Sequence, residues 1–289
     1  MPRPVRASLG SIIGRPEAGV RYAQTAAELA NDARYEPFAN GLNRFWEANG
    51  HLMAGELERT LELVTDLAGQ DGPARVYGHC GQTMLLARLG RHNEATAIAE
   101  QGLAAARAHG NPFVVALAFL SNGLAYSRSE PARALETFSQ GLAWTRKHRL
   151  PFHEVNIARE AAPLEAVHGD LDTALSMLDD VINSLQQAGQ VTQLALALAN
   201  LVVIVDRAER AEIAATVYGS TINHPGTKAI FEVARVVDHL RAMLGDETFE
   251  RFVATGKAME LPGAVRYARN QIQLARQELA TPRQADGTR

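Results

Sequence analysis

The small and apolar residues of the chain recur in a pattern with a period near forty. A small residue is followed four positions later by an apolar one, and a small-plus-aliphatic pair stands three and four positions further on. The small residues that open each copy are Gly19, Thr60, Ala95, Ala134 and Ala174, at intervals of 41, 35, 39 and 40 residues. Such periods are typical of helical-hairpin solenoids and are too long for a coiled-coil heptad.

Glycine and proline positions divide each period into two helices. Gly90 and Gly110 fall where the apolar pattern stops, and Asn93 is placed to cap the helix between them. Strand signals are missing, since few β-branched residues alternate with polar ones. The pattern predicts an all-α fold, a right-handed superhelical solenoid of antiparallel helix pairs. The predicted pairs are 35–49 with 56–68, 74–89 with 93–108, 112–126 with 130–147, 151–167 with 171–187, and 190–205 with 209–218.

The same pattern predicts how the chain is divided. Residues 1–34 hold a partial N-terminal repeat, because Pro2 and Pro4 shorten its first helix, and 35–220 hold the full helical repeats. Residues 221–280 carry two further apolar stripes, Ile230, Val233, Val237, Leu240 and Leu244, and Val265, Ala268, Ile272, Ala275 and Leu279. We expect them to form helices that cap the solenoid. The tail 281–289 is expected to be disordered.

The repeated positions are expected to belong to the core. A small residue such as Ala134 lets two crossing helices approach to about 8–10 Å, and a larger one such as Phe138 fills the space beside the crossing. Cys80, the only cysteine, is expected in the core as well. A single cysteine excludes an intrachain disulfide and fits a reducing cytoplasm.

The charge and hydropathy of the chain argue against two classes of partner. The formal net charge is −3, so no global basic field exists to attract nucleic acid or an anionic membrane. The most apolar run, 194–205, has 12 residues, whereas a membrane span needs about 20. The sequence therefore predicts a cytoplasmic protein with no direct nucleic-acid or membrane binding.

No catalytic, metal or cofactor motif can be assembled. A phosphate-binding loop of the Gly-x-x-x-x-Gly-Lys-Ser/Thr type fails at 251–258, because Arg251 stands where the first glycine belongs and Ala258 where the hydroxyl belongs. His79 and Cys80 are adjacent, so on a helix they diverge by about 100° and cannot chelate one ion. We expect a non-enzymatic protein, since an enzyme would need titratable groups drawn together from separate repeats in a deep pocket.

Five polar residues near the middle of successive first helices, hereafter the polar ladder, form the candidate binding site. Their separations are 35, 40, 38 and 40 residues, which follow the repeat. If the first helices line the concave surface, these side chains face a groove that binds a protein, a peptide or a small effector. The alternative is that they form interhelical hydrogen bonds that fix the stacking, and we expect that structural role to prevail. The ladder residues are Glu47, Gln82, Asn122, Glu160 and Asn200, with Arg44, Arg88 and Arg159 nearby.

Three local motifs resemble tetratricopeptide (TPR) repeats. They are 134–142 (Ala-Leu-x-x-Phe-x-x-Gly-Leu), 89–95 (Leu-Gly-Arg-x-x-Glu-Ala) and 169–174 (Gly-Asp-x-x-x-Ala). The period near forty resembles the longer variant of the maltose-regulator type of bacterial transcription activators. This likeness implies a TPR-like solenoid.

The stretch from Ala208 to Ala268 is similar to the carboxyl-terminal end of large actinobacterial regulators. In those proteins an ATP-binding module precedes such repeats, and a nucleotide-cyclase domain or a LuxR-type DNA-binding domain occurs in some. The resemblance implies a non-catalytic regulatory or sensor module for protein or effector binding, the detached or truncated C-terminal part of an ATP-dependent transcription regulator that acts in signal transduction. The alternative is a general TPR-type peptide-binding scaffold.

Overall fold

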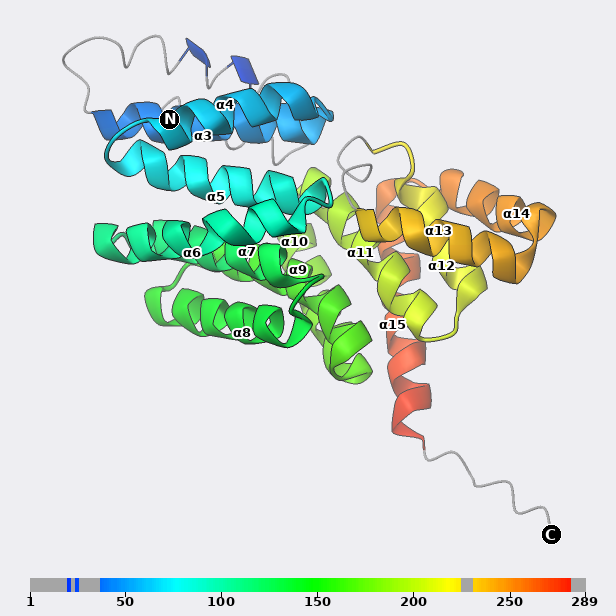
Figure 1. Cartoon of the computed structure of the whole chain (residues 1–289). Coiled ribbons are helices and arrows are strands. Elements are labelled where there is room, and N and C mark those ends of the chain that lie inside the picture. The colour runs from blue at the N-terminus through cyan, green and yellow to red at the C-terminus, as the bar shows by residue number, and fades with distance from the viewer. Residues whose placement is uncertain (1–19, 22–23, 26–36, 225–230, 282–289) are drawn as a thin grey trace.

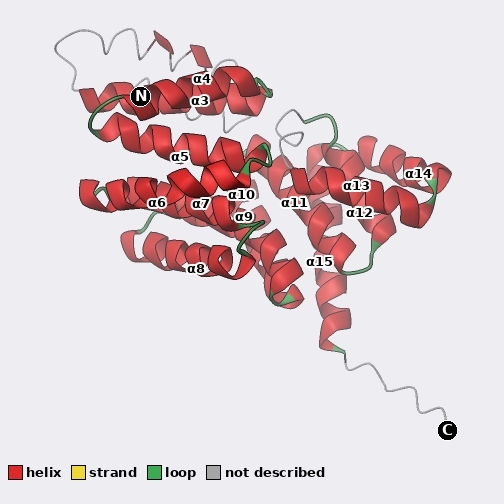
Figure 2. Cartoon of the chain, viewed as in Figure 1, coloured by secondary structure: helices red, strands yellow, loops and turns green. Residues whose placement is uncertain are grey.

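The computed structural model describes residues 20–21, 24–25, 37–224 and 231–281, and within these residues every regular element is an α-helix (Figure 2). The predicted all-α fold is therefore confirmed. The helices are α3 (Pro37–Ala54), α4 (Leu57–Gly69), α5 (Pro73–Arg88), α6 (His92–His109), α7 (Pro112–Tyr126), α8 (Pro131–His148), α9 (Pro151–His168), α10 (Leu171–Gln187), α11 (Val191–Arg207), α12 (Ala211–Thr221), α13 (Phe231–Leu244), α14 (Asp246–Lys257) and α15 (Leu261–Ala280).

The helices α3 to α12 form five consecutive pairs. The first helices of these pairs begin at Pro37, Pro73, Pro112, Pro151 and Val191, so their starts are 36, 39, 39 and 40 residues apart. Proline suits the first position of a helix, because its fixed φ is helical and its missing N–H would have no partner there. Asn111 and Asp170 cap α7 and α10 by accepting hydrogen bonds from backbone N–H groups. Asn93 is not the cap that we predicted, because α6 begins one residue earlier.

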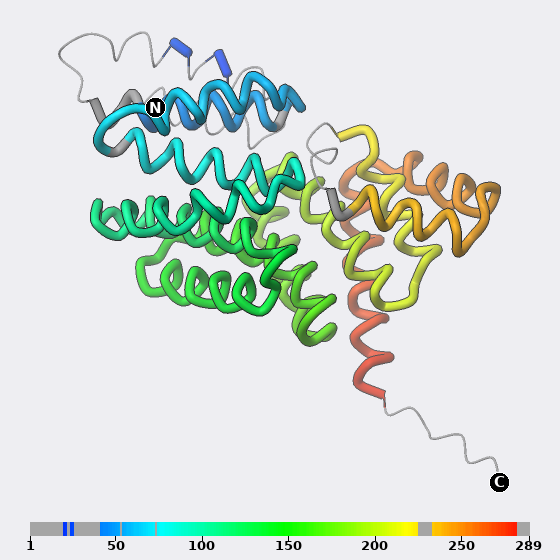
Figure 3. Tube along the Cα trace, viewed as in Figure 1, coloured from blue at the N-terminus to red at the C-terminus, as the bar shows by residue number. Residues whose placement is uncertain are grey.

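The pairs stack as a solenoid. Each helix packs on the next in the chain, and the first helices also pack on one another in the order α3, α5, α7, α9, α11. In Figure 1 the pairs from α3 to α8 lie in one arm, and Figure 3 shows the chain then turning into a second arm that contains α11 to α15. The first helices thus form one continuous inner layer.

The repeated small residues lie in the core, as their spacing predicts. Thr60, Ala95, Ala134 and Ala174 are all buried. Phe138 of α8 is also buried and packs over Gly123 of α7, where a Cβ atom would lie 2.2 Å from the phenyl ring. Cys80 is a free, buried thiol, and burial raises its pKa to about 12. These positions serve packing.

The last three helices cover the end of the solenoid. α13 packs on α11 and α12, α14 packs on α12, and α15 lies along α10, α11 and α12. Arg269 and Arg276 of α15 form ion pairs of 2.8 and 2.7 Å with Asp179 and Asp172 of α10. Leu279 is an exception to the predicted apolar stripe, because it is 50% exposed near the end of α15.

One cluster of buried side chains joins the two ends of the solenoid. It combines Leu52 of α3 and Val64 of α4 with Leu196 of α11 and Val233 of α13. The described solenoid is therefore curved far enough for side chains of α3, α4 and α5 to share one buried cluster with α11 and α13. The predicted partial repeat at 1–34, the small residue Gly19 and the tail at 282–289 lie outside the described residues, apart from residues 20–21 and 24–25.

Candidate functional site

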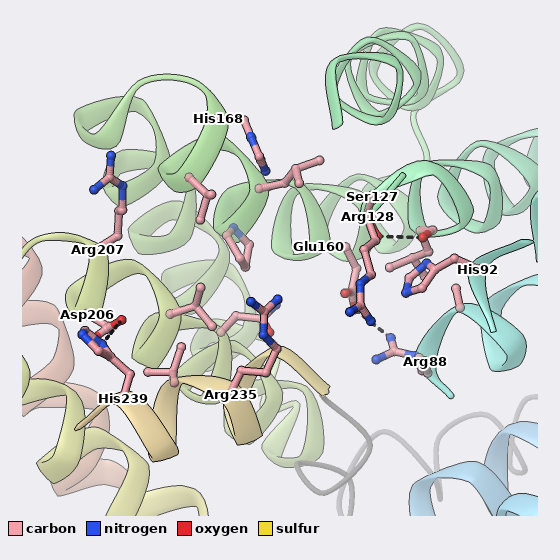
Figure 4. Close-up of a pocket in the computed structure, with 18 residues that line it drawn as sticks. Arg88, His92, Ser127, Arg128, Glu160, His168, Asp206, Arg207, Arg235 and His239 are labelled. Atoms are coloured by element: carbon pink, nitrogen blue, oxygen red, sulfur yellow. Dashed lines mark hydrogen bonds and ion pairs between the residues drawn. The ribbon is translucent and has the colours of Figure 1, made fainter. Parts of the chain in front are cut away.

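A pocket of about 460 Å³ lies on the inner layer of the solenoid, near the carboxyl ends of its first helices. Three of its walls come from α7, α9 and α11, where Leu124, Pro163 and Val203 follow one another at repeat spacing. Helix α5 adds Arg88, and α13, which lies outside the pairs, adds Arg235, Val236 and His239. Figure 4 shows these side chains around the pocket.

A network of ionic side chains crosses one wall of the pocket. The Glu160 carboxylate accepts hydrogen bonds from Arg88 at 2.8 Å and from Arg159 at 2.7 Å, and Arg159 also donates to Gln193 of α11. Burial alone would raise the pKa of the Glu160 carboxyl, but the charges of Arg88 and Arg159 outweigh it and lower this pKa to about 2. Glu160 is thus an anion between two guanidinium groups. Its hydrogen bond with Arg88, which is 72 residues away in the sequence, connects α9 to α5.

Asn200 donates a hydrogen bond to a backbone carbonyl that has no donor within its own helix, α9. Pro163 lies inside α9 and has no N–H, so it cannot donate to the carbonyl of Arg159 one turn earlier. The Asn200 side chain of α11 donates a hydrogen bond of 2.8 Å to that carbonyl. A buried carbonyl without a donor is costly, so this contact gives Asn200 a structural role at the pocket wall.

On the α13 side, the Asp206 carboxylate contacts the His239 ring at 3.0 Å. Asp206 belongs to α11, and its side chain is only 16% exposed. Arg235 stands one helical turn before His239 on α13 and reaches toward the middle of the pocket (Figure 4). The pocket therefore has charged groups on two facing sides and apolar side chains between them.

The structure brings together two of the five polar-ladder residues, Glu160 and Asn200, both of which line this pocket. Asn122 lines a separate hollow between α6, α7 and α8, where its buried Oδ1 atom has no hydrogen-bond partner among the described residues. Gln82 donates to Thr65 of α4 at 3.1 Å, and Glu47 accepts a hydrogen bond from Gln24 at 3.2 Å. Ligand binding by the ladder stays a prediction, and its members do not share one groove.

A difference of one residue in register separates Asn122 from the pocket. Glu160 stands three residues before Pro163 and Asn200 three before Val203, whereas Asn122 stands only two before Leu124. One residue turns a side chain by about 100° around a helix. Ser121 is therefore the α7 counterpart of Glu160 and Asn200, and it is buried with its hydroxyl bonded to the Ala118 carbonyl.

The nearby arginines are placed differently from one another. Arg88 and Arg159 are largely buried in the pocket wall, whereas Arg44 is exposed and forms a 3.4 Å ion pair with Asp66. Sequence reasoning missed Arg128, Asp206, Arg207, Arg235 and His239, all of which line the pocket. Pro163 inside a helix was a signal for the structural role of Asn200, because the Arg159 carbonyl that Pro163 leaves unpaired requires a donor from another element.

Nothing in the described part of the chain assembles a metal centre. No group of three or more histidine, cysteine, aspartate or glutamate side chains there could hold an ion. Thr255, Gly256 and Lys257, compared above with a phosphate loop, lie inside α14, where Gly256 packs against the backbone of α12. The charged groups and apolar walls of the pocket are suited to holding a ligand.

Comparison with solved structures identifies the type of fold. The chain is similar to a Rap protein in the crystal structure of that protein complexed with competence and sporulation factor, with a TM-score of 0.54 and 15% sequence identity. The match covers 96% of this chain and 75% of that chain. It supports a TPR-like helical-repeat fold, which agrees with the predicted class.

No protein-family model and no curated protein match the sequence. The predicted link to actinobacterial LuxR-type regulators therefore has no support beyond the motifs themselves. Among the described helices, none combines the length and the apolar character needed to cross a membrane.

Proposed function

We propose that this protein is a non-catalytic regulatory module that binds an effector in the pocket between α7, α9, α11 and α13. The observation that carries the proposal is the position of the pocket on the inner layer, with a wall supplied by α13 from outside the pairs. Ligand pockets typically measure about 300–1,000 Å³ and combine apolar walls with a few placed polar groups. This pocket has a volume of about 460 Å³ and both kinds of lining.

The Rap protein supports a binding role, since its structure contains competence and sporulation factor. A pocket bordered by α13 favours a small effector or a short peptide over a long peptide laid along an open groove. A general peptide-binding scaffold is the alternative, and it predicts contacts along α3 and α5, where Glu47 and Gln82 lie.

The module can act as a sensor because the pocket joins elements that are distant in the chain. An effector bound in the pocket would link α9 to α13 through the ligand, and a partner that contacts α13 would respond to that change. The finer proposal, a cytoplasmic sensor arm of an ATP-dependent transcription regulator, rests on the sequence motifs. Copurification of a nucleotide-binding protein in an effector-dependent manner tests it.

Thermal melting with a library of metabolites and short peptides tests effector binding. A ligand at one hundred times its Kd stabilises the fold by about 2.7 kcal/mol. Val167 is 44% exposed at the pocket edge, so Val167→Trp should fill the pocket without disturbing the core. Binders should stabilise the parent and not this variant. A library without any saturable binder, or binders that act equally on both proteins, would contradict the proposal.

A further inference from the structure

The pocket carries an excess of positive charge in a chain whose net charge is −3. Four arginines line it, Arg88, Arg128, Arg207 and Arg235, against two carboxylates. Both carboxylates already have partners. Glu160 lies between Arg88 and Arg159, and Asp206 contacts His239. Neither carboxylate of this lining is left to bind a cationic ligand group.

Two of the four pocket arginines, Arg207 and Arg235, have no carboxylate as an ion-pair partner among the described residues. Two arginines of α15 that face α10, Arg269 and Arg276, pair with aspartates of that helix. Arginines that serve packing between helices thus have counter-ions, whereas these two pocket arginines have none in the part of the chain that the structure describes.

The remaining lining is mostly apolar, and its polar members are Ser127, Asn200 and the histidines His92, His168 and His239. Leu124, Pro163, Leu164, Val203 and Val236 line the pocket together with the charged groups, and Figure 4 shows Arg88 and Arg235 entering it from different elements. Arg235 is itself exposed, so its charge is accessible to a ligand from solvent, and the apolar side chains beside it reduce the water that competes for the charge once a ligand is bound. An occupant that complements both features has an apolar body and at least one negatively charged group.

We propose that the effector is an organic anion with an apolar body, and that Arg235 of α13 binds its charged group. This inference rests on the proposed function, since it names the ligand class of the same pocket. A carboxylate and a sulfonate or phosphate share the required chemistry. Binding would connect α13 to the inner layer through the ligand.

Two fluorescent probes with the same ring system separate charge from apolar contact. Anilinonaphthalene sulfonate carries a negative charge, and N-phenylnaphthylamine is its uncharged counterpart. Titrations of the full chain would measure both affinities at low and high salt. The variants are Arg235→Met, Arg235→Lys, the pocket-filling Val167→Trp, and the control Arg266→Met, which removes an exposed arginine of α15 away from the pocket.

We expect the parent to bind the anionic probe roughly tenfold more tightly than the neutral one, and to lose much of this preference in high salt. Arg235→Met should abolish the preference, whereas Arg235→Lys and Arg266→Met should retain it. Circular dichroism would establish that each variant is folded.

Two results would overturn the inference in distinguishable ways. If the two probes bind the parent equally, or if Arg235→Met keeps the full preference, the pocket does not select anions, although it still binds ligands as proposed. If Val167→Trp changes the binding of neither probe, the probes bind elsewhere, and the proposed function fails together with the inference.

Discussion

Asn200 shows how the role of one side chain follows from the chemistry of another. Its hydrogen bond to the Arg159 carbonyl replaces the one that Pro163 cannot donate. Asn200→Ala should therefore lower the free energy of unfolding by about 1–3 kcal/mol. In a Pro163→Ala background the restored N–H can serve the carbonyl, so the same change should cost less than about 1 kcal/mol. Urea unfolding of the four proteins measures this coupling, and strictly additive losses would contradict it.

His153 is a buried base at the start of α9. It is 2% exposed, it packs 4.2 Å from the Phe113 ring centroid, and neither ring nitrogen has a hydrogen-bond partner among the described residues. Burial disfavours the charged imidazolium and lowers the pKa of His153 to about 4. Because the folded-state pKa lies below the unfolded value of about 6.5, the unfolded chain binds more protons between these pH values. Stability is therefore lost as the pH falls through this window.

His153→Leu should remove this pH dependence. Between pH 7.5 and pH 5 the parent should lose about 2 kcal/mol of unfolding free energy through His153, in addition to losses at other histidines. The variant should lose correspondingly less over the same interval, measured by urea unfolding at both pH values. His168→Gln, a change at an exposed residue, serves as the control and should keep the full dependence. Equal losses in the parent and in His153→Leu would refute the assignment.

At the scale of elements, the crossing of α12 and α14 depends on two glycines. A Cβ atom on Gly256 would lie 1.9 Å from the Thr216 carbonyl oxygen, and one on Gly219 would lie 2.2 Å from the Val253 carbonyl oxygen. Both contacts are with backbone atoms, which cannot turn aside as a side chain can. The two helices therefore approach as closely as their backbones allow.

Gly256→Ala should separate these helices and destabilise the protein by about 1–3 kcal/mol or more. Gly263→Ala is the matched control, because a Cβ atom added there would have a flexible arginine nitrogen, 3.9 Å away, as its nearest neighbour. In a helix this second change should be neutral or slightly stabilising. Thermal melting compares the two variants, and similar melting temperatures for both would show that the crossing tolerates a side chain.

The elements themselves could be predicted because local signals agree along the chain. Proline or glycine marks most helix boundaries, and the buried residues Ala134, Phe138 and Leu178 fall on the predicted face. The beginning of α6 was predicted less well, since Asn93 resembles a cap while the helix already includes His92. Exposure of Leu279 could not be foreseen either, because it depends on where α15 extends beyond α10.

The site was less predictable than the fold, for two physical reasons. Repeat spacing locates a side chain only to within a residue or two, and one residue was enough to turn Asn122 away from Glu160 and Asn200. The second reason is that Arg235 and His239 come from α13, whose position over α11 follows from tertiary packing. No local pattern relates residue 235 to residue 88.

At the scale of the whole molecule, contacts between distant pairs distinguish this chain from a simple stack. In an ordinary solenoid each repeat contacts only its neighbours, so stability is local and the ends unfold separately. Here Arg88 of α5 binds Glu160 of α9 across the intervening α7–α8 pair. The buried cluster that contains Leu52 and Val233 also joins the two ends. We therefore expect the described solenoid to unfold as one cooperative unit.

Glu160→Gln tests this cooperativity. It leaves the guanidinium groups of Arg88 and Arg159, 11% and 5% exposed, without a counter-charge, and breaking a buried ion pair in this way costs about 3–5 kcal/mol. Glu154→Gln is the control, because its ion pair with Arg146 is exposed and contributes about 0–1 kcal/mol. In urea, Glu160→Gln should also unfold with a smaller m-value or in two steps, since the pairs on either side of α7 and α8 are no longer connected through the pocket wall. A single transition with an unchanged slope and a loss no larger than that of the control would mean that the curved solenoid is held together by its apolar contacts alone.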